Sequence, residues 1–443
     1  MPTQLTADAL MNRDRTSGLQ LLTLFFCFLV VAADGFDVAS VGYVAPLLKK
    51  AWSLTPAQLG PIFGAGLLGL TIGSFLFGPL ADRIGRKRVI VISMMLFGTG
   101  SLACSFADSL RWLVALRFLT GVGLGGAMPT AITLASEFTS ERKRAWQVTL
   151  MFCGFTLGLA FGGAVAAALI PTFGWQGVFV FGGIVPLCLA PIIWRWIPES
   201  LRFMAGKPRF NSEARSVMQR LVGKDNAIPD ITVSDTAPDN ATANRVIGTL
   251  FSKYFRAGTL LLWLSFFCTL WVYYQISSWL PVIFTEAGIA IAQAATIGAM
   301  MPLGGTVGAL INGKLMDRYN PFVVLSFSYL VAAVSIGCIG LAIADAYLIY
   351  VVVFCTGLGL SGAQTGANVL VSGFYTTRAR ATGVSWALAI GRIGSIFGSM
   401  TGGIILAHLP SVKTAFIAFA FPTVIAGLAM LAIGFIYRSH SEK

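Results

Sequence analysis

Long apolar stretches recur along almost the whole sequence, and they limit the fold more than any other feature. Each has about the 20 residues that an α-helix needs to cross the hydrocarbon core of a bilayer. The stretches are continuous rather than alternating, so they predict helices and not barrel strands. We expect twelve spans, at residues 19–48, 57–80, 88–107, 110–136, 146–170, 175–197, 257–285, 292–313, 322–344, 346–373, 381–408 and 412–437.

The charge content agrees with a membrane protein. Of 443 residues, 56% are hydrophobic and 11% are charged, whereas soluble domains have about 25% charged residues. The loops after the second, fourth, eighth and tenth spans hold eleven Lys and Arg, and the loops at the opposite ends hold four. The positive-inside rule therefore predicts that both termini are cytoplasmic. The net charge of +13 needs no nucleic-acid partner to explain it.

The two halves of the chain repeat each other. Residues 78–87 read GPLADRIGRK, and GKLMDR begins at Gly313, 235 residues later (313 − 78). A repeat at half the chain length predicts two pseudo-symmetric six-helix bundles with a pathway between them. The expected parts are a tail at 1–16, a bundle at 17–197, a cytoplasmic linker at 198–256 with a short amphipathic helix over 211–222, a bundle at 257–437 and a tail at 438–443.

Glycines recur at four-residue spacing in the fifth and eleventh spans, which is typical of closely packed helices. They are residues 154, 158 and 162 in the first half and 394, 398 and 402 in the second.

Two carboxylates lie in the middle of the first span. Asp34 and Asp37 are three residues apart, so on a helix they share a face. Each costs roughly 2.5–3.5 kcal/mol on insertion scales, so such groups usually face a protein interior or a wet cavity. A buried carboxylate can gain or lose a proton when its surroundings change. We therefore predict that at least one of them takes up a proton; the alternative is that both are permanently salt-bridged to arginines and hold this span to the fourth.

Two arginines lie inside the fourth and eleventh spans. Arg117 and Arg392 cannot lose their charge, so each needs an anion nearby. That anion is Asp34, Asp37 or a substrate carboxylate held by a bidentate pair. We favour Arg392 for the substrate, and the opposite assignment stays open.

Aromatic and amide side chains in the seventh and tenth spans are further candidates. Trp271, Tyr274 and Gln275 recur at helical spacing and could stack on a benzene ring and bond its hydroxyl; core packing is the alternative. Trp279 is expected in the aromatic belt at the membrane surface. Gln364 and Asn368 lie four residues apart in the tenth span, so they share a helix face. Buried amides need hydrogen-bond partners, which would be another helix or a substrate.

Charged residues at the cytoplasmic ends of the spans lie too far from mid-membrane to touch a substrate. Asp82 can cap a neighbouring helix or pair with an arginine in one state only, which would make it a conformational latch. The basic residues beside it also set the topology, and the two roles are compatible. The expected gate comprises Gly78, Asp82, Arg83, Gly85, Arg86, Glu137, Arg144, Asp317, Arg318 and Arg380.

The segment GPLADRIGRK, its weaker copy and the glycine-rich stretch after Arg117 resemble the major facilitator superfamily over essentially the whole chain. The Asp-Gly-Phe-Asp segment at 34–37 is similar to the aromatic acid:proton symporter family, which carries hydroxybenzoates and protocatechuate into bacteria. The resemblance implies a twelve-helix secondary transporter that imports a small aromatic carboxylate with a proton by alternating access. It also implies a multi-pass protein of the bacterial inner (plasma) membrane.

Two other functions remain open from the sequence. One is a proton symporter of another organic acid or a sugar, and the other is a membrane sensor that binds a ligand without moving it. No nucleophile–base pair, metal-ligand cluster or phosphate loop is visible, so we expect no enzyme activity, no cofactor and no metal. The expected partners are the aromatic acid, protons and membrane lipids, with the protein acting as a monomer.

Overall fold

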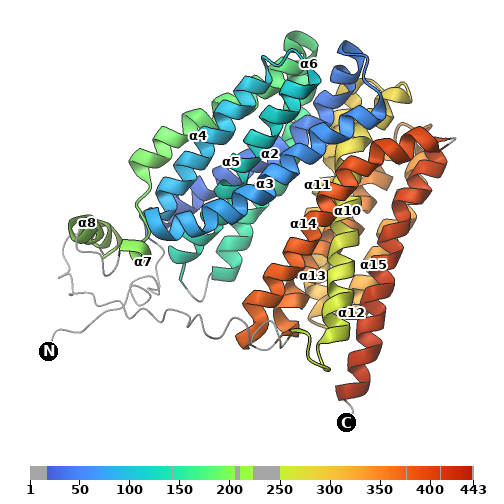
Figure 1. The fold of residues 1–443 in the computed structure, drawn as a ribbon. Helices are drawn as coiled ribbons and strands as arrows, with labels where there is room; N and C mark the ends of the chain where they lie inside the picture. The colour runs from blue at the N-terminus through green and yellow to red at the C-terminus, as the bar shows by residue number, and fades with distance from the viewer. Residues whose placement is uncertain are drawn as a thin grey trace. The chain divides into compact units, whose positions relative to one another are not determined.

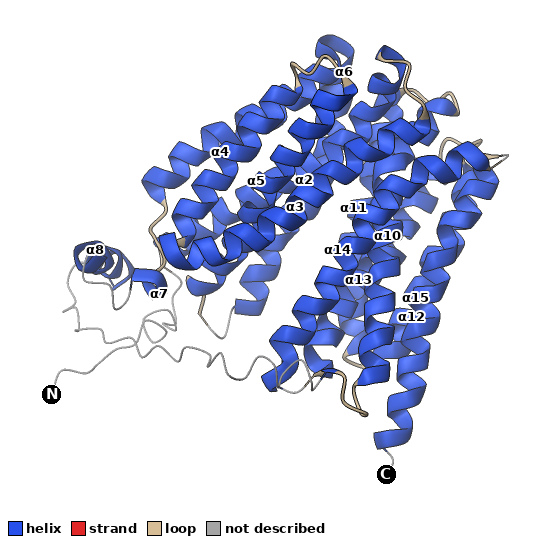
Figure 2. Ribbon diagram, viewed as in Figure 1, coloured by secondary structure: helices blue, strands red, loops and turns tan. Residues whose placement is uncertain are grey.

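The computed structural model describes residues 17–140, 144–204, 210–222, 250–375, 377–409 and 411–441. Every regular element in these ranges is helical, as Figures 1 and 2 show. Eleven of the described helices are long and apolar enough to cross a membrane. The prediction of an all-α, multi-pass membrane protein is therefore confirmed. The expected N-terminal tail, residues 1–16, lies outside the described residues.

The helices follow the expected spans closely. The first half of the chain forms α2 (Gly18–Ala51), α3 (Pro56–Ile84), α4 (Arg86–Cys104), α5 (Leu110–Glu137) and α6 (Arg144–Trp196), followed by the short helices α7 (Leu201–Met204) and α8 (Asn211–Val222). The second half forms α10 (Arg256–Glu286), α11 (Ile291–Met316), α12 (Pro321–Ala342), α13 (Leu348–Phe374), α14 (Thr377–His408) and α15 (Val412–Ser441).

Helix α6 accounts for two of the twelve expected spans. It has 53 residues and is interrupted at Gly174, where φ is 65° and ψ is −167°. Glycine adopts a positive φ without the steric cost that a side chain would impose. The spans expected at 146–170 and 175–197 are thus two arms that meet at this residue.

The expected amphipathic helix at 211–222 is confirmed as α8. Its residues Val217 and Met218 are buried, together with Phe210 just before it. The ring of Phe210 lies 5.5 Å from that of Phe203 in α7. The buried residues of α8 and α7 thus belong to one apolar cluster of the first unit.

The described residues group into two compact units. The first takes in those of 1–37, 68–158 and 179–237, and the second those of 38–67, 159–178 and 238–443. These boundaries cut across α2, α3 and α6. The division into two bundles at 17–197 and 257–437 stays a prediction.

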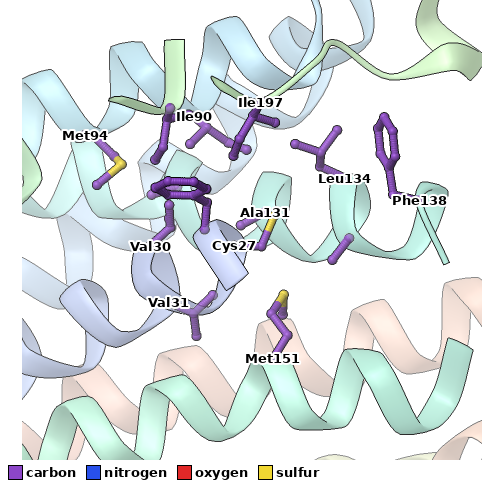
Figure 3. Close-up of a cluster of buried hydrophobic side chains, with 14 of the residues drawn as sticks. Cys27, Val30, Val31, Ile90, Met94, Ala131, Leu134, Phe138, Met151 and Ile197 are labelled. Atoms are coloured by element: carbon purple, nitrogen blue, oxygen red, sulfur yellow. The ribbon is translucent and has the colours of Figure 1, made fainter. Parts of the chain in front are cut away.

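A cluster of buried apolar side chains in the first unit holds the middle of α2 (Figure 3). Cys27, Val30 and Val31 face residues of α4, α5 and α6, among them Met94 and Leu134. Asp34 follows Val30 by four residues, and Asp37 follows three residues later. The buried stripe of α2 thus continues directly into the two carboxylates, because residues three and four apart share a helix face.

Candidate functional site

A buried ion pair joins α2 to α5. Arg117 Nη1 donates to Asp37 Oδ1 at 3.0 Å, and Arg117 Nη2 donates to Asp37 Oδ2 at 2.9 Å. Asp37 is 1% exposed and Arg117 is 4% exposed. The guanidinium also lies over the ring of Phe179, 5.9 Å from its centroid. The sequence left the anion of Arg117 open; in this structure it is Asp37, in the bidentate geometry that gives the strongest charge-assisted pairs.

Asp34 lies one turn before Asp37 on the same face of α2. It is 1% exposed, so both carboxylates are withdrawn from water. An ion pair that holds the first and fourth spans together was one of the two expected outcomes for these residues, and the geometry of Asp37 matches it. The uptake of a proton at either carboxylate stays a prediction.

Close backbone packing positions the two carboxylates. A Cβ placed on Gly35, between them, would run into the carbonyl oxygen of Phe155 on α6. A Cβ on Gly158 of α6 would in turn meet the carbonyl oxygen of Ala32. The two helices touch backbone to backbone, as small residues allow in membranes.

The repeat-related helices α14 and α10 pack in the same way. Gly394 lies against the carbonyl oxygen of Phe267, and Gly398 lies against that of Trp271. The prediction that the four-residue glycine spacing marks close helix packing is therefore confirmed at these positions. The glycines of α6 meet α2, and those of α14 meet α10.

Three of the expected gate residues come together in the first unit. Arg86 Nη2 lies 3.0 Å from Asp82 Oδ1 and 3.4 Å from Glu137 Oε1. The Asp82 side chain is 73% exposed, whereas that of Glu137 is only 8% exposed. Gly85, at the start of α4, has a φ of 111°, a conformation that favours glycine.

Sequence reasoning missed one member of this cluster, Glu199. Its Oε1 accepts hydrogen bonds from the backbone N–H groups of Arg86 (2.9 Å) and Lys87 (3.1 Å), at the N-terminus of α4. The backbone N–H of Ser200 donates to the same oxygen at 3.0 Å. A carboxylate is favourable there because the first N–H groups of a helix lack helical acceptors. The signal was an acidic residue directly after the sixth span, in a stretch assigned to the linker.

The other expected gate residues have different surroundings. A Cβ on Gly78 would meet no atom within 4 Å. The side chain of Arg144 lies outside the described residues. The remaining four are exposed, and none of them forms an ion pair with another described residue: Arg83, Asp317, Arg318 and Arg380.

The aromatic and amide candidates of α10 lie in the second unit. Gln275 is 1% exposed, while Trp271 and Tyr274 are half-buried. The Trp271 ring packs edge-on against Phe397, with 4.8 Å between centroids and 89° between planes. Trp271 Nε1 and Gln275 Nε2 are buried and have no hydrogen-bond partner among the described residues. The two donors lie on one face of α10, four residues apart.

The candidates of α13 and α14 are less buried than expected. Gln364 and Arg392 are half-buried, and Asn368 is exposed. Gln364 Nε2 lies 3.5 Å from Asn368 Oδ1, a long contact for a hydrogen bond. The expectation that both amides are buried in apolar surroundings is wrong for Asn368, because its side chain is exposed among the described residues.

Trp279 does not belong to an aromatic belt. It is fully buried, and its Nε1 donates to the carbonyl oxygen of Ser399 at 2.9 Å. Its ring lies 5.3 Å from that of Phe63. The belt expectation is wrong because the Trp279 side chain packs between Phe63 of α3 and helix α14.

The candidates thus form two sets, each within its own unit. Asp34, Asp37 and Arg117 belong to the first unit; Trp271, Tyr274, Gln275, Gln364, Asn368 and Arg392 belong to the second. In the described part of the chain, no group of three or more His, Cys, Asp or Glu is arranged to hold a metal ion.

Comparison with known proteins gives consistent matches. The family model of the Major Facilitator Superfamily matches residues 27–343 and 283–443. The gallate transporter of Pseudomonas putida is 42% identical over 94% of this chain and 92% of its own. The 4-hydroxybenzoate transporter PcaK of Pseudomonas aeruginosa is 40% identical over 99% of this chain and 97% of its own.

A solved structure shares the fold. The inward open conformation of the xylose transporter XylE from E. coli superimposes with a TM-score of 0.71, covering 93% of this chain and 96% of that one. The two sequences are 15% identical, so the likeness concerns the fold alone.

Proposed function

This chain belongs to the major facilitator superfamily, and we propose that it imports a small aromatic carboxylate, of the 4-hydroxybenzoate or protocatechuate type, together with a proton. The observation that carries the proposal is the buried Asp37–Arg117 pair beside Asp34, in the middle of an otherwise apolar helix. Ionisable groups at such a position are costly and are typical of proton and substrate pathways. The names of the two relatives support the aromatic acid as cargo.

The transport cycle uses the two carboxylates as the proton site. Asp34 or Asp37 takes up a proton from the outer side, and protonation of Asp37 weakens its hold on Arg117. The substrate anion then binds, the protein changes from outward-facing to inward-facing, and proton and anion leave inside. The Asp82–Arg86–Glu137 cluster at the cytoplasmic ends of α3, α4 and α5 acts as the latch that forms and breaks in this cycle.

The substrate site uses the second set of residues. Arg392 holds the carboxylate, because a permanent guanidinium half-buried in α14 can form a charge-assisted pair with it. Trp271 and Tyr274 contact the ring, and Gln275 donates to a ring hydroxyl. Gln364 and Asn368 offer further hydrogen bonds. The protein works as a monomer in the bacterial inner membrane, with both termini in the cytoplasm.

The direct test is uptake by purified protein in liposomes under an imposed pH gradient. The panel contains labelled 4-hydroxybenzoate, protocatechuate, gallate, succinate and D-xylose. We expect gradient-driven accumulation of at least one aromatic acid and none of succinate or xylose. Accumulation of succinate or xylose alone would show that the transported substrate is another organic acid or a sugar. Binding of an aromatic acid without counterflow would identify a sensor instead of a transporter.

Replacing Arg392 with Gln is expected to raise the KM for the aromatic acid by about 10- to 100-fold. A hydrogen bond to a charged group is worth about 1.5–3 kcal/mol, and each 1.4 kcal/mol is tenfold in affinity. The measurement is counterflow as a function of substrate concentration. Arg256→Gln, at the exposed start of α10, is the matched control and leaves the KM unchanged. An unchanged KM in Arg392→Gln would indicate that the substrate carboxylate binds Arg117 instead.

A further inference from the structure

An ion pair joins the ends of α2 and α10. Lys49 Nζ contacts Glu286 Oε1, and their side chains are 26% and 42% exposed. We propose that this pair is an outer lock: it holds the outer end of the transport path closed and must break when that path opens. The inference rests on the proposed alternating-access function. The charge count of the loops predicts that this end faces away from the cytoplasm.

The ion pair lies at the rim of a tightly packed contact between the two halves of the sequence. Within the second unit, residues 38–67 and 159–178 pack against helices of the second half. A Cβ on Gly42 would come within 2.9 Å of the Ser277 carbonyl oxygen, and one on Gly60 within 2.7 Å of that of Met400. We call this contact the outer seam. The first approach brings α2 against α10, and the second brings α3 against α14.

Tyr43 fills the outer seam further along α2. Its side chain is buried, and its hydroxyl oxygen lies 3.1 Å from a Cβ placed on Gly163 and 2.9 Å from one placed on Gly298. Any side chain at these two glycines would displace the tyrosine. These packing contacts stabilise the closed seam, and they involve no charged group. The Lys49–Glu286 pair is the charged contact across the same boundary.

The surroundings of the pair suit a contact that opens in every cycle. Lys49 and Glu286 line a surface hollow of about 800 Å³, together with Lys50, Ser53 and Thr285. Water therefore reaches both charges. Ion pairs that are this exposed are weak and are screened by salt. A weak pair biases the equilibrium toward the closed seam without preventing its opening.

The test measures opening of the outer seam directly. Ser277, half-buried in the seam, is replaced by Cys as a reporter for a membrane-impermeant maleimide, in the full chain in liposomes. The same chain without the reporter gives the background from the seven native cysteines. We expect Lys49→Gln and Glu286→Gln each to raise the rate of reporter labelling by about two- to five-fold, the range for an exposed pair.

Charge reversal separates a lock from a general surface effect. The double variant Lys49→Glu with Glu286→Lys rebuilds the pair and is expected to return labelling to the parent rate. Lys50→Gln removes a neighbouring exposed charge and is expected to leave labelling unchanged. High salt, about 1 M, should raise parent labelling toward that of the single variants because it screens the pair.

Three results would overturn the lock. They are single variants that label at or below the parent rate, a reversed pair that labels like the single variants, and a Lys50→Gln variant that labels as fast as Lys49→Gln. Labelling is independent of substrate identity, so a failure of the lock is distinct from a failure of the aromatic acid assignment.

Discussion

Asp37→Asn is expected to lower pH-gradient-driven uptake at least about 100-fold. The substitution removes the carboxylate that neutralises Arg117 and leaves a permanent charge in a buried site. Breaking a buried pair by removing one partner costs about 3–5 kcal/mol, and each 1.4 kcal/mol is tenfold in an equilibrium. The variant also lacks one of the two carboxylates that are proposed to carry the proton. Both effects act in the same direction on uptake.

A second variant distinguishes the lost charge balance from the lost proton site. Asp37→Asn combined with Arg117→Gln removes both charges, so the buried site is again neutral. We expect the double variant to recover the thermal stability lost in Asp37→Asn and to recover substrate counterflow. It should not recover accumulation driven by the pH gradient. Stability is measured by thermal unfolding in detergent, and transport by counterflow and by gradient-driven uptake in the same liposomes.

Asp34→Asn is the matched comparison, because it removes the other carboxylate from the same buried face of α2. If Asp34→Asn abolishes gradient-driven uptake and the double variant at Asp37 and Arg117 keeps it, the proton site is Asp34. If Asp37→Asn itself accumulates substrate at the wild-type rate, neither the charge-balance argument nor the proton role of Asp37 holds.

Gly35→Leu is expected to abolish uptake and to lower the yield of folded protein severely. A Cβ at this position runs into the backbone of Phe155 on α6, and a backbone cannot rotate away as a flexible side chain can. Overpacking a well-packed interior typically costs about 1–3 kcal/mol and occasionally more, and an entire leucine side chain between two touching helices is at the upper end. Separation of α2 from α6 would also displace Asp34 and Asp37.

Gly337→Leu is the matched control. It lies in α12, and a Cβ there would meet no atom within 4 Å. Leucine is also a better helix former than glycine, so this variant should fold and transport like the wild type. The measurements are yield after size-exclusion chromatography, thermal unfolding and uptake. Equal yields and unfolding temperatures for the two variants would show that the close approach of α2 and α6 does not limit folding.

The burial of several candidate site residues could be predicted from the sequence because charged residues are rare in apolar spans. Four charged residues stand out in apolar spans, and three of them, Asp34, Asp37 and Arg117, are buried in the first unit. The sequence did not predict which carboxylate pairs with Arg117, because Asp34 and Asp37 share a helix face and each could reach an arginine. The choice of Asp37 follows from how α2 and α5 pack, which no local pattern encodes.

Other features depend on contacts between distant segments. Glu199 binds the N-terminus of α4 from 113 residues away. Trp279 is buried because Phe63, from the first half of the chain, and helix α14 both pack on it. The sequence pattern of Trp279, an aromatic residue near the end of a span, is the same for a belt residue as for a buried one. Asn368 shows the converse, since a polar residue in an apolar span turned out to be exposed.

The sequence by itself determined that this protein is helical and spans a membrane, because the bilayer requires long apolar segments whose backbone groups are satisfied within each helix. It also determined where each helix begins and ends to within a few residues, and which charges lie inside the spans. The tertiary structure alone decided which of those charges meet and which aromatic residues are covered. It also decided that Lys49 and Glu286 join the ends of α2 and α10. Such contacts depend on the relative placement of helices, which is set by many weak packing interactions rather than by any one segment.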